Sequence, residues 1–248
     1  MILAIDTSSA LTSVALVDGT EVIAERTHLD ARRHAEVLAP LLRDVLRSID
    51  RQSITAVACG VGPGPYTGLR VGIASARAVA AAWDLPVLGI CSLDAIAAAA
   101  LSGAEAGDVF VATDARRREV YWAHYAADGA RIEGPLVCRP GDIAADLRAG
   151  TWAGHGALAH ATDFDSVLVS GPLGEHEPTS ALQYAHACWV GRRVQALLAA
   201  GAVQAAAPVT LSVHGGDGSS TSAQLRGIEL LPPVPLYLRR PDVAEPTP

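Results

Sequence analysis

The chain has 248 residues with 19 basic and 26 acidic side chains, which gives a formal net charge of −7 at neutral pH. All 19 basic residues are arginine, and neither lysine nor asparagine occurs. The absence of lysine excludes a Walker A phosphate loop and Schiff-base enzymes, and the absence of asparagine excludes N-glycosylation. An acidic chain is also a poor candidate for holding nucleic acid unaided, because phosphate binding needs clustered positive charge.

Length, hydropathy and cysteine spacing set further limits. A chain of this length can form one large domain or two modest ones, each with its own core. No apolar run of about 18 uncharged residues occurs, and the first residues lack the basic segment of a signal peptide, so we expect no membrane span and no secretion. The cysteines are far apart, which favours reduced thiols in the cytoplasm: Cys59, Cys91, Cys138 and Cys188.

The first hundred residues predict three strands followed by alternating helices and strands. The opening strands are short and separated by tight turns, one of them Asp18-Gly19, so they should lie adjacent and antiparallel. Leucine and valine then recur every three or four residues, which is typical of a helix with one buried face. Strands are expected at 2–5, 12–17, 21–27, 55–61 and 86–90, and helices at 33–49, 69–83 and 92–101.

The second part of the chain repeats this order of elements. Strands are expected at 109–113, 119–126, 131–138 and near 167–169, with helices at 142–149 and 181–200. A three-strand meander followed by helices therefore occurs twice, which predicts two related α/β halves. We place an N-terminal subdomain at 1–104 and a C-terminal subdomain at 105–209. Residues 210–248 are then a flexible Gly/Ser-rich insertion, a returning segment and a disordered tail.

A glycine-rich loop between a buried strand and a helix is the most distinctive local motif. Such a junction exposes backbone N–H groups at the positive end of a helix, which can hold an anion. Glycines there can equally serve a tight turn or close packing, so both interpretations stay open. A second weak signal is the carboxylate and hydroxyls that end the first strand. Together these motifs give the candidate nucleotide or phosphate site as Asp6, Thr7, Ser8, Gly62, Gly64, Thr67 and Gly68.

A short basic run, Arg116 to Arg118, joins two expected strands of the second half. A solvated hairpin tip and a phosphate contact are both open interpretations. Neither a nucleophile elbow nor a His-Glu-x-x-His zinc motif occurs, so we expect no catalytic residue and no metal site.

Several segments resemble, in order, the TsaB (YeaZ) family. They are ILAIDTS, RRHAEVLAPLL, GVGPGPYTGLRVG, LGICSL, TDARRREVYWAHY and the closing PLYLR, and they run from Ile2 to Arg239. The resemblance implies an actin-like fold of two ribonuclease-H-like subdomains, each a mixed sheet with helices. Four residues of its motifs have no assigned role: Asp114, Arg116, Glu119 and Tyr121.

The resemblance also implies a function. TsaB-like proteins support threonylcarbamoyl transfer to the tRNA adenosine adjacent to the anticodon. They do so as the non-catalytic partner of TsaD, with the ATPase TsaE as a third component. By this resemblance the chain has no activity of its own and no intrinsic cofactor, and the partner interface is the possible place for ADP or ATP. It forms a heterodimer with TsaD, or a homodimer when isolated, and meets tRNA only indirectly.

Two departures from related active sites support that interpretation. Aligning the TsaD metal-binding helix on Gly89 and Leu93 places Ser92 and Ile96 where two metal-binding histidines would stand. Actin-like ATPases also place a glycine after the first aspartate, whereas Thr7 follows Asp6 here. A Cβ at that position crowds the approach of a phosphate.

Two helices of the first half have apolar or small-residue faces suited to another helix pair. We expect paralogues that share a fold to dock through these faces, although the same residues would also suit packing on their own sheet. The candidate interface residues are His34, Leu38, Leu42, Val45, Gly72, Ala76 and Ala80. The alternative functions are a stand-alone kinase or ATPase of the same fold and, less favoured, a metallopeptidase.

Overall fold

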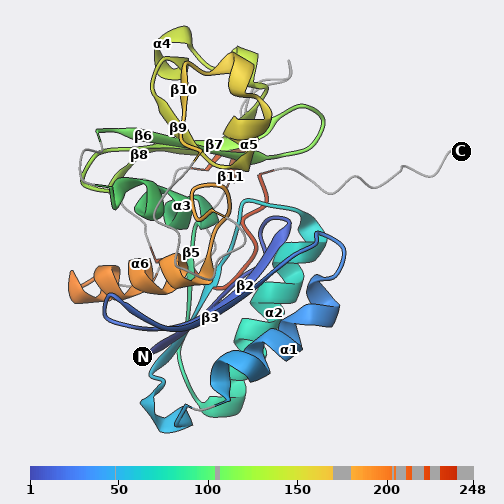
Figure 1. The fold of residues 1–248 in the computed structure, drawn as a ribbon, viewed down its shortest axis with the longest axis vertical. Helices are drawn as coiled ribbons and strands as arrows, with labels where there is room; N and C mark the ends of the chain where they lie inside the picture. Colours follow the sequence, from blue (N-terminus) through green and yellow to red (C-terminus); the bar gives the residue numbers. More distant parts are fainter. Residues whose placement is uncertain are drawn as a thin grey trace, which may run out of the picture.

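The structure is a computed structural model that describes residues 1–47, 49–103, 107–169, 180–202, 204, 211–213, 221–223 and 230–238. Two mixed sheets and their helices form alternating layers (Figure 1). This confirms the predicted α/β fold class of two related subdomains. Among the described helices, none is long and apolar enough to cross a membrane.

The first sheet holds five strands in the order β3-β2-β1-β4-β5. The meander is antiparallel as predicted, and β1 pairs in parallel with β4, which pairs in parallel with β5. The strands are β1 (Ile2–Asp6), β2 (Leu11–Asp18), β3 (Glu21–Leu29), β4 (Ala56–Gly60) and β5 (Val87–Ile90). Every residue of β1 and β4 is buried, because both faces of this sheet are covered.

The second sheet repeats this topology. Its strands lie in the order β10-β9-β6-β7-β8-β12-β11, in which β8-β7-β6-β9-β10 corresponds to β3-β2-β1-β4-β5. The pairs β6–β7 and β7–β8 are antiparallel, while β6–β9 and β9–β10 are parallel. The strands are β6 (Val109–Asp114), β7 (Val120–Tyr125), β8 (Arg131–Cys138), β9 (Thr151–Ala153), β10 (Ser166–Val167), β11 (Leu211–Val213) and β12 (Thr221–Ala223).

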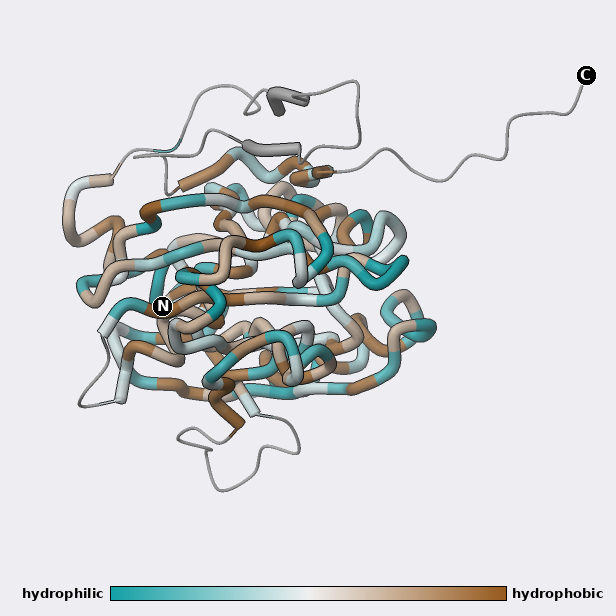
Figure 2. Tube along the Cα trace, turned by 90° about the horizontal axis from the view of Figure 1, so that it is seen from above, coloured by the Kyte–Doolittle hydropathy of each residue, from teal (hydrophilic) through white to brown (hydrophobic). Residues whose placement is uncertain are grey.

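Helices α1 (His34–Leu46) and α2 (Tyr66–Trp83) lie side by side on one face of the first sheet, and α6 (Ala187–Ala199) covers the other (Figure 1). Helix α3 (Ser92–Leu101) packs on α6 and on strands of the second sheet. Short helices α4 (Ala145–Arg148) and α5 (His155–Ala159) connect the later strands. Along the chain hydrophobic stretches alternate with hydrophilic ones, as elements with one buried face require (Figure 2).

The two halves therefore exchange helices. Helix α3 follows the first sheet in sequence but packs on β6, β7 and β9, whereas α6 follows the second sheet but packs on β1, β2 and β4. One hydrophobic cluster consequently runs through both halves, from Leu3 on β1 to Val190 on α6. The predicted boundary at residue 104 lies outside the described residues, and the boundaries remain predictions.

The expected helix and strand ranges differ from the structure in several places. Among them, α1 ends at Leu46 and α2 already begins at Tyr66, while β11 and β12 were not expected as strands. The helix expected from residue 181 begins at Ala187, because His186 is extended and serves as its N-cap. The helix expected at 142–149 shortens to α4. Strand β9 and helix α5 were not predicted, since three and five residues are too few to show a period.

The C-terminal region returns to the first sheet. Leu231 exchanges two backbone hydrogen bonds with Gly89, and the N–H of Leu236 donates to the carbonyl of Val61 at 2.8 Å. Strands β11 and β12 form an antiparallel pair at the ends of the predicted insertion, and β12 contacts β8. The predicted disordered tail lies outside the described residues.

A buried ion pair joins the exchanged helix α3 to the second sheet. Arg131 Nη1 donates to Asp94 Oδ1 at 2.9 Å, and both side chains are only 4% exposed. The hydroxyl of Tyr125 donates to the same carboxylate oxygen at 2.7 Å. Removing one partner of such a pair leaves a buried charge without compensation.

We predict that Asp94→Ala lowers the free energy of unfolding by about 3–5 kcal/mol, because Arg131 and Tyr125 lose their shared acceptor. Urea unfolding followed by circular dichroism measures this loss. The control is Asp128→Ala in an exposed turn, which should cost less than about 1 kcal/mol. Equal losses in both variants would contradict the assigned importance of the pair.

Candidate functional site

The candidate site lies where the parallel strands of the first sheet end. Asp6 is the last residue of β1, the glycine-rich loop follows β4, and Ser92 begins the helix after β5. Because β1, β4 and β5 run parallel, their carboxyl ends meet at one edge. In open α/β sheets this edge is the usual place for a ligand.

Both oxygens of the Asp6 carboxylate accept hydrogen bonds from groups of the protein itself. Oδ1 accepts hydrogen bonds from the Ser8 backbone N–H at 2.8 Å and from the Ser8 hydroxyl at 2.7 Å. Oδ2 accepts from the Ser92 hydroxyl at 2.8 Å, and Ser92 Oγ in turn accepts from the N–H of Gly62 at 3.1 Å. Asp6 is 1% exposed. Burial raises the pKa of its carboxyl, and the hydrogen bonds from Ser8 and Ser92 offset part of that rise.

Four glycines at a spacing of four residues cradle the turn that follows Asp6. A Cβ at any of these positions would collide with Asp6, Thr7 or Ser8: Gly60, Gly64, Gly68 and Gly72. The hydroxyl of Thr7 donates to the carbonyl of Gly68 at 2.7 Å, which fixes the turn to the start of α2. The glycines are therefore needed for the close approach of the loop and helix to this turn.

The structure thus brings together most of the predicted phosphate-site residues. Asp6, Thr7 and Ser8 are buried against Gly62, Gly64 and Gly68, while the side chain of Thr67 is exposed. Their polar groups bind each other, an arrangement that favours the packing interpretation of the loop. Phosphate binding at these residues stays a prediction.

His34, the first residue of α1, is hydrogen-bonded to strand β2. Its Nδ1 is hydrogen-bonded to Thr12 Oγ1 at 2.7 Å, and the residue is 5% exposed. Burial lowers the pKa of His34, which favours the neutral imidazole.

Six of the seven predicted interface residues are buried within the chain itself. Leu38, Val45, Ala76 and Ala80 belong to the hydrophobic core, and Gly72 packs against Thr7. His34 is buried as well, so these six residues are not accessible to a partner. Leu42 is the one predicted interface residue that is partly exposed. The sequence pattern was that of a helix face packed on its own sheet. The prediction that α1 and α2 meet a partner is untested and now depends on the outer faces of these helices.

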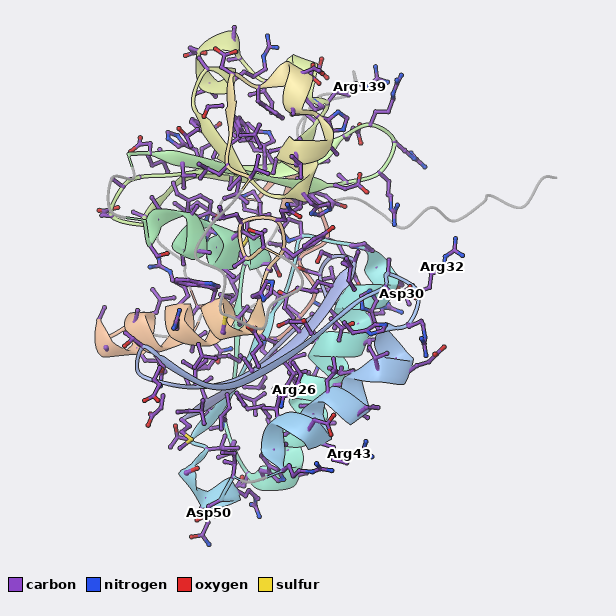
Figure 3. All side chains as sticks on the ribbon, in the orientation of Figure 1. Arg26, Asp30, Arg32, Arg43, Asp50 and Arg139 are labelled. Carbon is purple, nitrogen blue, oxygen red and sulfur yellow. The ribbon has the colours of Figure 1, made fainter. Side chains whose placement is uncertain are left out.

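Those outer faces carry small side chains. The exposed positions include Ala35 and Ala39 on α1 and Ala74, Ala78 and Ala81 on α2. Charged side chains such as Arg32, Arg43 and Asp50 lie on the outside of the molecule around α1 (Figure 3).

A group of two tyrosines and an arginine lies at the start of α2. The rings of Tyr66 and Tyr237 stack with centroids 4.9 Å apart, and the Arg70 guanidinium lies 3.8 Å from the centroid of Tyr66. Arg70 Nε also donates to the Tyr237 hydroxyl at 3.2 Å. These contacts fasten the returning C-terminal segment to α2.

The motif of the second half forms a strained turn between β6 and β7. Arg116, Arg117 and Arg118 all adopt positive φ angles, of 64°, 55° and 62°, which non-glycine residues rarely do. Asp114 Oδ1 accepts from the N–H of Arg116 at 2.9 Å, and the N–H of Glu119 donates to the carbonyl of Arg116. Burial raises the pKa of Tyr121 behind the turn. The motif therefore holds three exposed arginines in a fixed turn.

His155, which sequence reasoning missed, connects this turn to the segment before α6. Its Nε2 accepts from the N–H of Asp114 at 3.2 Å, and its Nδ1 lies 3.3 Å from the carbonyl oxygen of Gln183. Only the neutral tautomer with a proton on Nδ1 satisfies both contacts. Burial lowers the pKa of His155, and the hydrogen bond to Gln183 partly opposes this effect.

Sequence reasoning also missed a group of metal-ligand type. Glu25, His186 and Cys188 each place one ligand atom within 4.8 Å of the other two. The His-x-Cys spacing was visible in the sequence, but Glu25 lies 161 residues from His186, and no local pattern joins them.

We predict that Gly72→Ala lowers the free energy of unfolding by about 1–3 kcal/mol, because the new methyl group collides with Thr7 Oγ1. Chemical unfolding measures the loss. Thr7→Ala in the same chain should recover part of it by removing the atom in the way. Gly141→Ala is the control, since nothing lies within 4 Å of its Cβ position.

We also predict that stability falls as the pH drops below about 6.5, the pKa of an unfolded histidine. His155 has a lowered pKa in the folded chain, so the unfolded chain binds protons more readily, and acid favours unfolding. Its contribution is fully present above pH 6.5 and is lost toward the lower folded pKa. His155→Gln should flatten the pH dependence of the free energy of unfolding, measured by urea unfolding between pH 7.5 and 5.5. An unchanged slope in His155→Gln would refute this assignment.

A known protein family matches more than half of the chain. Residues 21–171 match the family model described as TsaD, tRNA N6-adenosine threonylcarbamoyltransferase. An uncharacterized protein of Mycobacterium tuberculosis is 46% identical over 146 residues, which cover 57% of this chain and 66% of the relative. The tRNA threonylcarbamoyladenosine biosynthesis protein TsaB of Escherichia coli is 40% identical over 130 residues, covering 51% of this chain and 55% of that protein. The match thus spans somewhat less than two thirds of the length of these relatives.

Solved structures agree over a larger part of the chain. YeaZ from Pseudomonas aeruginosa is 29% identical with a TM-score of 0.66, and the match covers 81% of this chain and 92% of that one. Another P. aeruginosa protein, described as similar to peptidase YeaZ, is 25% identical with a TM-score of 0.69 over 96% of this chain and 99% of its own. The family model, the related sequences and the solved structures agree, and the chain belongs to the TsaB (YeaZ) family.

Proposed function

We propose that this protein takes part in forming threonylcarbamoyladenosine in tRNA, as a subunit without catalytic activity of its own. It supports a TsaD-like subunit that transfers the threonylcarbamoyl group to the adenosine adjacent to the anticodon, together with a TsaE-like ATPase. Relatives from Escherichia coli, Haemophilus influenzae and Bacillus subtilis carry the name tRNA threonylcarbamoyladenosine biosynthesis protein TsaB. The reaction takes place in the cytoplasm, where we place this chain.

The closed Asp6 turn is the observation that supports a role without catalysis. Both oxygens of the Asp6 carboxylate already accept hydrogen bonds, and Ser92, at a position matching a metal-binding histidine of TsaD, supplies one of them. Ile96, at the second such position, is 1% exposed and belongs to the core. These residues hold the loop together instead of presenting free ligands to a nucleotide or metal.

The outer face of α1 and α2 is the proposed docking surface for the catalytic subunit. Its exposed alanines allow the backbone of another helix pair to approach closely, and the helices leave this face without a cover in the described chain. A partner of the same fold would dock with its equivalent helices, and a second copy of this chain would do so in isolation. We place ADP or ATP, if bound, at this partner interface.

The charge of the chain supports an indirect contact with tRNA. A net charge of −7 repels phosphate overall. The catalytic subunit therefore holds the tRNA, and this subunit supports that enzyme.

Reconstitution tests the proposal. Threonylcarbamoyl transfer to tRNA is measured by nucleoside mass spectrometry with TsaD and TsaE, in the presence and absence of this chain. We expect transfer to require the chain. Equal transfer without it would overturn the proposed function.

The docking surface is tested in the same reaction with Ala78→Arg on the outer face of α2. Because Ala78 is exposed, the variant should fold normally, yet a buried arginine at the interface should weaken TsaD binding at least about tenfold and reduce transfer. Ala196→Arg, at an exposed position of α6, is the matched control and should bind TsaD normally. Unchanged affinity of Ala78→Arg would remove α2 from the interface. Ala76→Arg is unsuitable, since Ala76 is fully buried.

A further inference from the structure

A cluster of three different ligand types lies where α6 meets the first sheet. Glu25 comes from β3, His186 is the N-cap of α6, and Cys188 is in its first turn. His186 Nδ1 is 3.5 Å from Glu25 Oε2. One ring nitrogen of His186, the Cys188 Sγ and one carboxylate oxygen of Glu25 all lie within 4.8 Å of one another. The side chains of Glu25 and His186 are 8% and 0% exposed, and Cys188 is 3% exposed.

We propose that Glu25, His186 and Cys188 bind a zinc ion. Imidazole nitrogen, thiolate sulfur and carboxylate oxygen are the three donors that zinc accepts in proteins, whereas magnesium and calcium prefer oxygen alone. With zinc bonds of about 2.0–2.3 Å, tetrahedral ligand atoms lie about 3.3–3.8 Å apart. The His186–Glu25 separation of 3.5 Å already has this value. The ligand atom of Cys188 lies within 4.8 Å of the other two, so zinc binding requires its side chain to move closer to them. The proposed fourth ligand is a water molecule.

Neighbouring groups orient the Glu25 carboxylate for this role. Its Oε1 accepts from the Ser13 hydroxyl at 2.9 Å and from the Cys188 backbone N–H at 3.1 Å. Ser13 Oγ in turn accepts from the N–H of Ala187 at 2.8 Å. These bonds hold one carboxylate oxygen and turn the other, Oε2, toward His186, as outer partners commonly do for metal ligands.

The location suits a structural ion. The N-terminus of α6 favours negative charge, and so the thiolate that metal binding requires. An ion here would fasten α6, which comes from the second half of the chain, to β3 of the first sheet. The exchanged helix α3 is fastened at the corresponding place by the Asp94–Arg131 ion pair.

Metal titration of the full chain, purified alone and treated with a chelator, tests the proposal. We expect one equivalent of cobalt to bind with the visible bands of a tetrahedral site and a thiolate-to-cobalt charge-transfer band in the near ultraviolet. Zinc should displace the cobalt. At a free zinc concentration of about 100 Kd, Tm should rise by about 5–10 °C. The unaltered chain is titrated first. Failure to bind one equivalent of cobalt, or cobalt binding without the charge-transfer band, would overturn the proposed zinc site.

Variants then assign the ligands. Cys188→Ser should abolish the charge-transfer band and the zinc-dependent rise in Tm, and Glu25→Gln should weaken zinc binding at least about tenfold. Cys138→Ser changes a thiol in the second sheet and should keep both signals, since Ser can still accept the hydrogen bond from Trp122. Retention of the charge-transfer band in folded Cys188→Ser would refute the assignment. Because TsaD is absent from this experiment, its outcome is independent of the proposed function.

Discussion

The exchange of α3 and α6 between the two sheets is the constraint on which the rest of the structure depends. Each helix buries its face on the sheet of the other half, so one hydrophobic cluster includes residues of both. Polar interactions hold both helices to these sheets, and we call them polar clamps. Asp94 on α3 binds Arg131 on β8, and the first turn of α6 meets Glu25 on β3. Neither half can move far without exposing apolar surface and breaking one of these clamps.

This rigid frame explains why the carboxyl edge of the first sheet is closed. With β1, β4 and β5 fixed in register, Asp6, Gly62 and Ser92 form one hydrogen-bonded chain across three strand ends. The glycines bring the loop and α2 against the same turn. An edge that opens on a ligand in other α/β folds is filled here by the protein's own groups.

Two exposed surfaces of the described chain lie outside this frame. The outer faces of α1 and α2 present small side chains, and the turn at Arg116 to Arg118 presents three arginines in a backbone conformation that costs energy. His155 couples that turn to the segment preceding α6. The strained turn is thus built into the second half rather than attached as a mobile loop.

The sequence by itself determined most of the order of elements and the repeated meander, because periodicity and turn residues are local properties. Its motifs also carried the resemblance to the TsaB (YeaZ) family. The sequence also located the Asp6 turn and the glycine-rich loop as neighbours. Only the tertiary structure decided which way each helix faces. The stripe of Leu38, Val45, Ala76 and Ala80 suits a partner or a sheet equally well, and burial places it on the sheet. Contacts between distant residues, such as Glu25 with His186 and Asp94 with Arg131, were likewise beyond the sequence, because they depend on how two sheets exchange their helices.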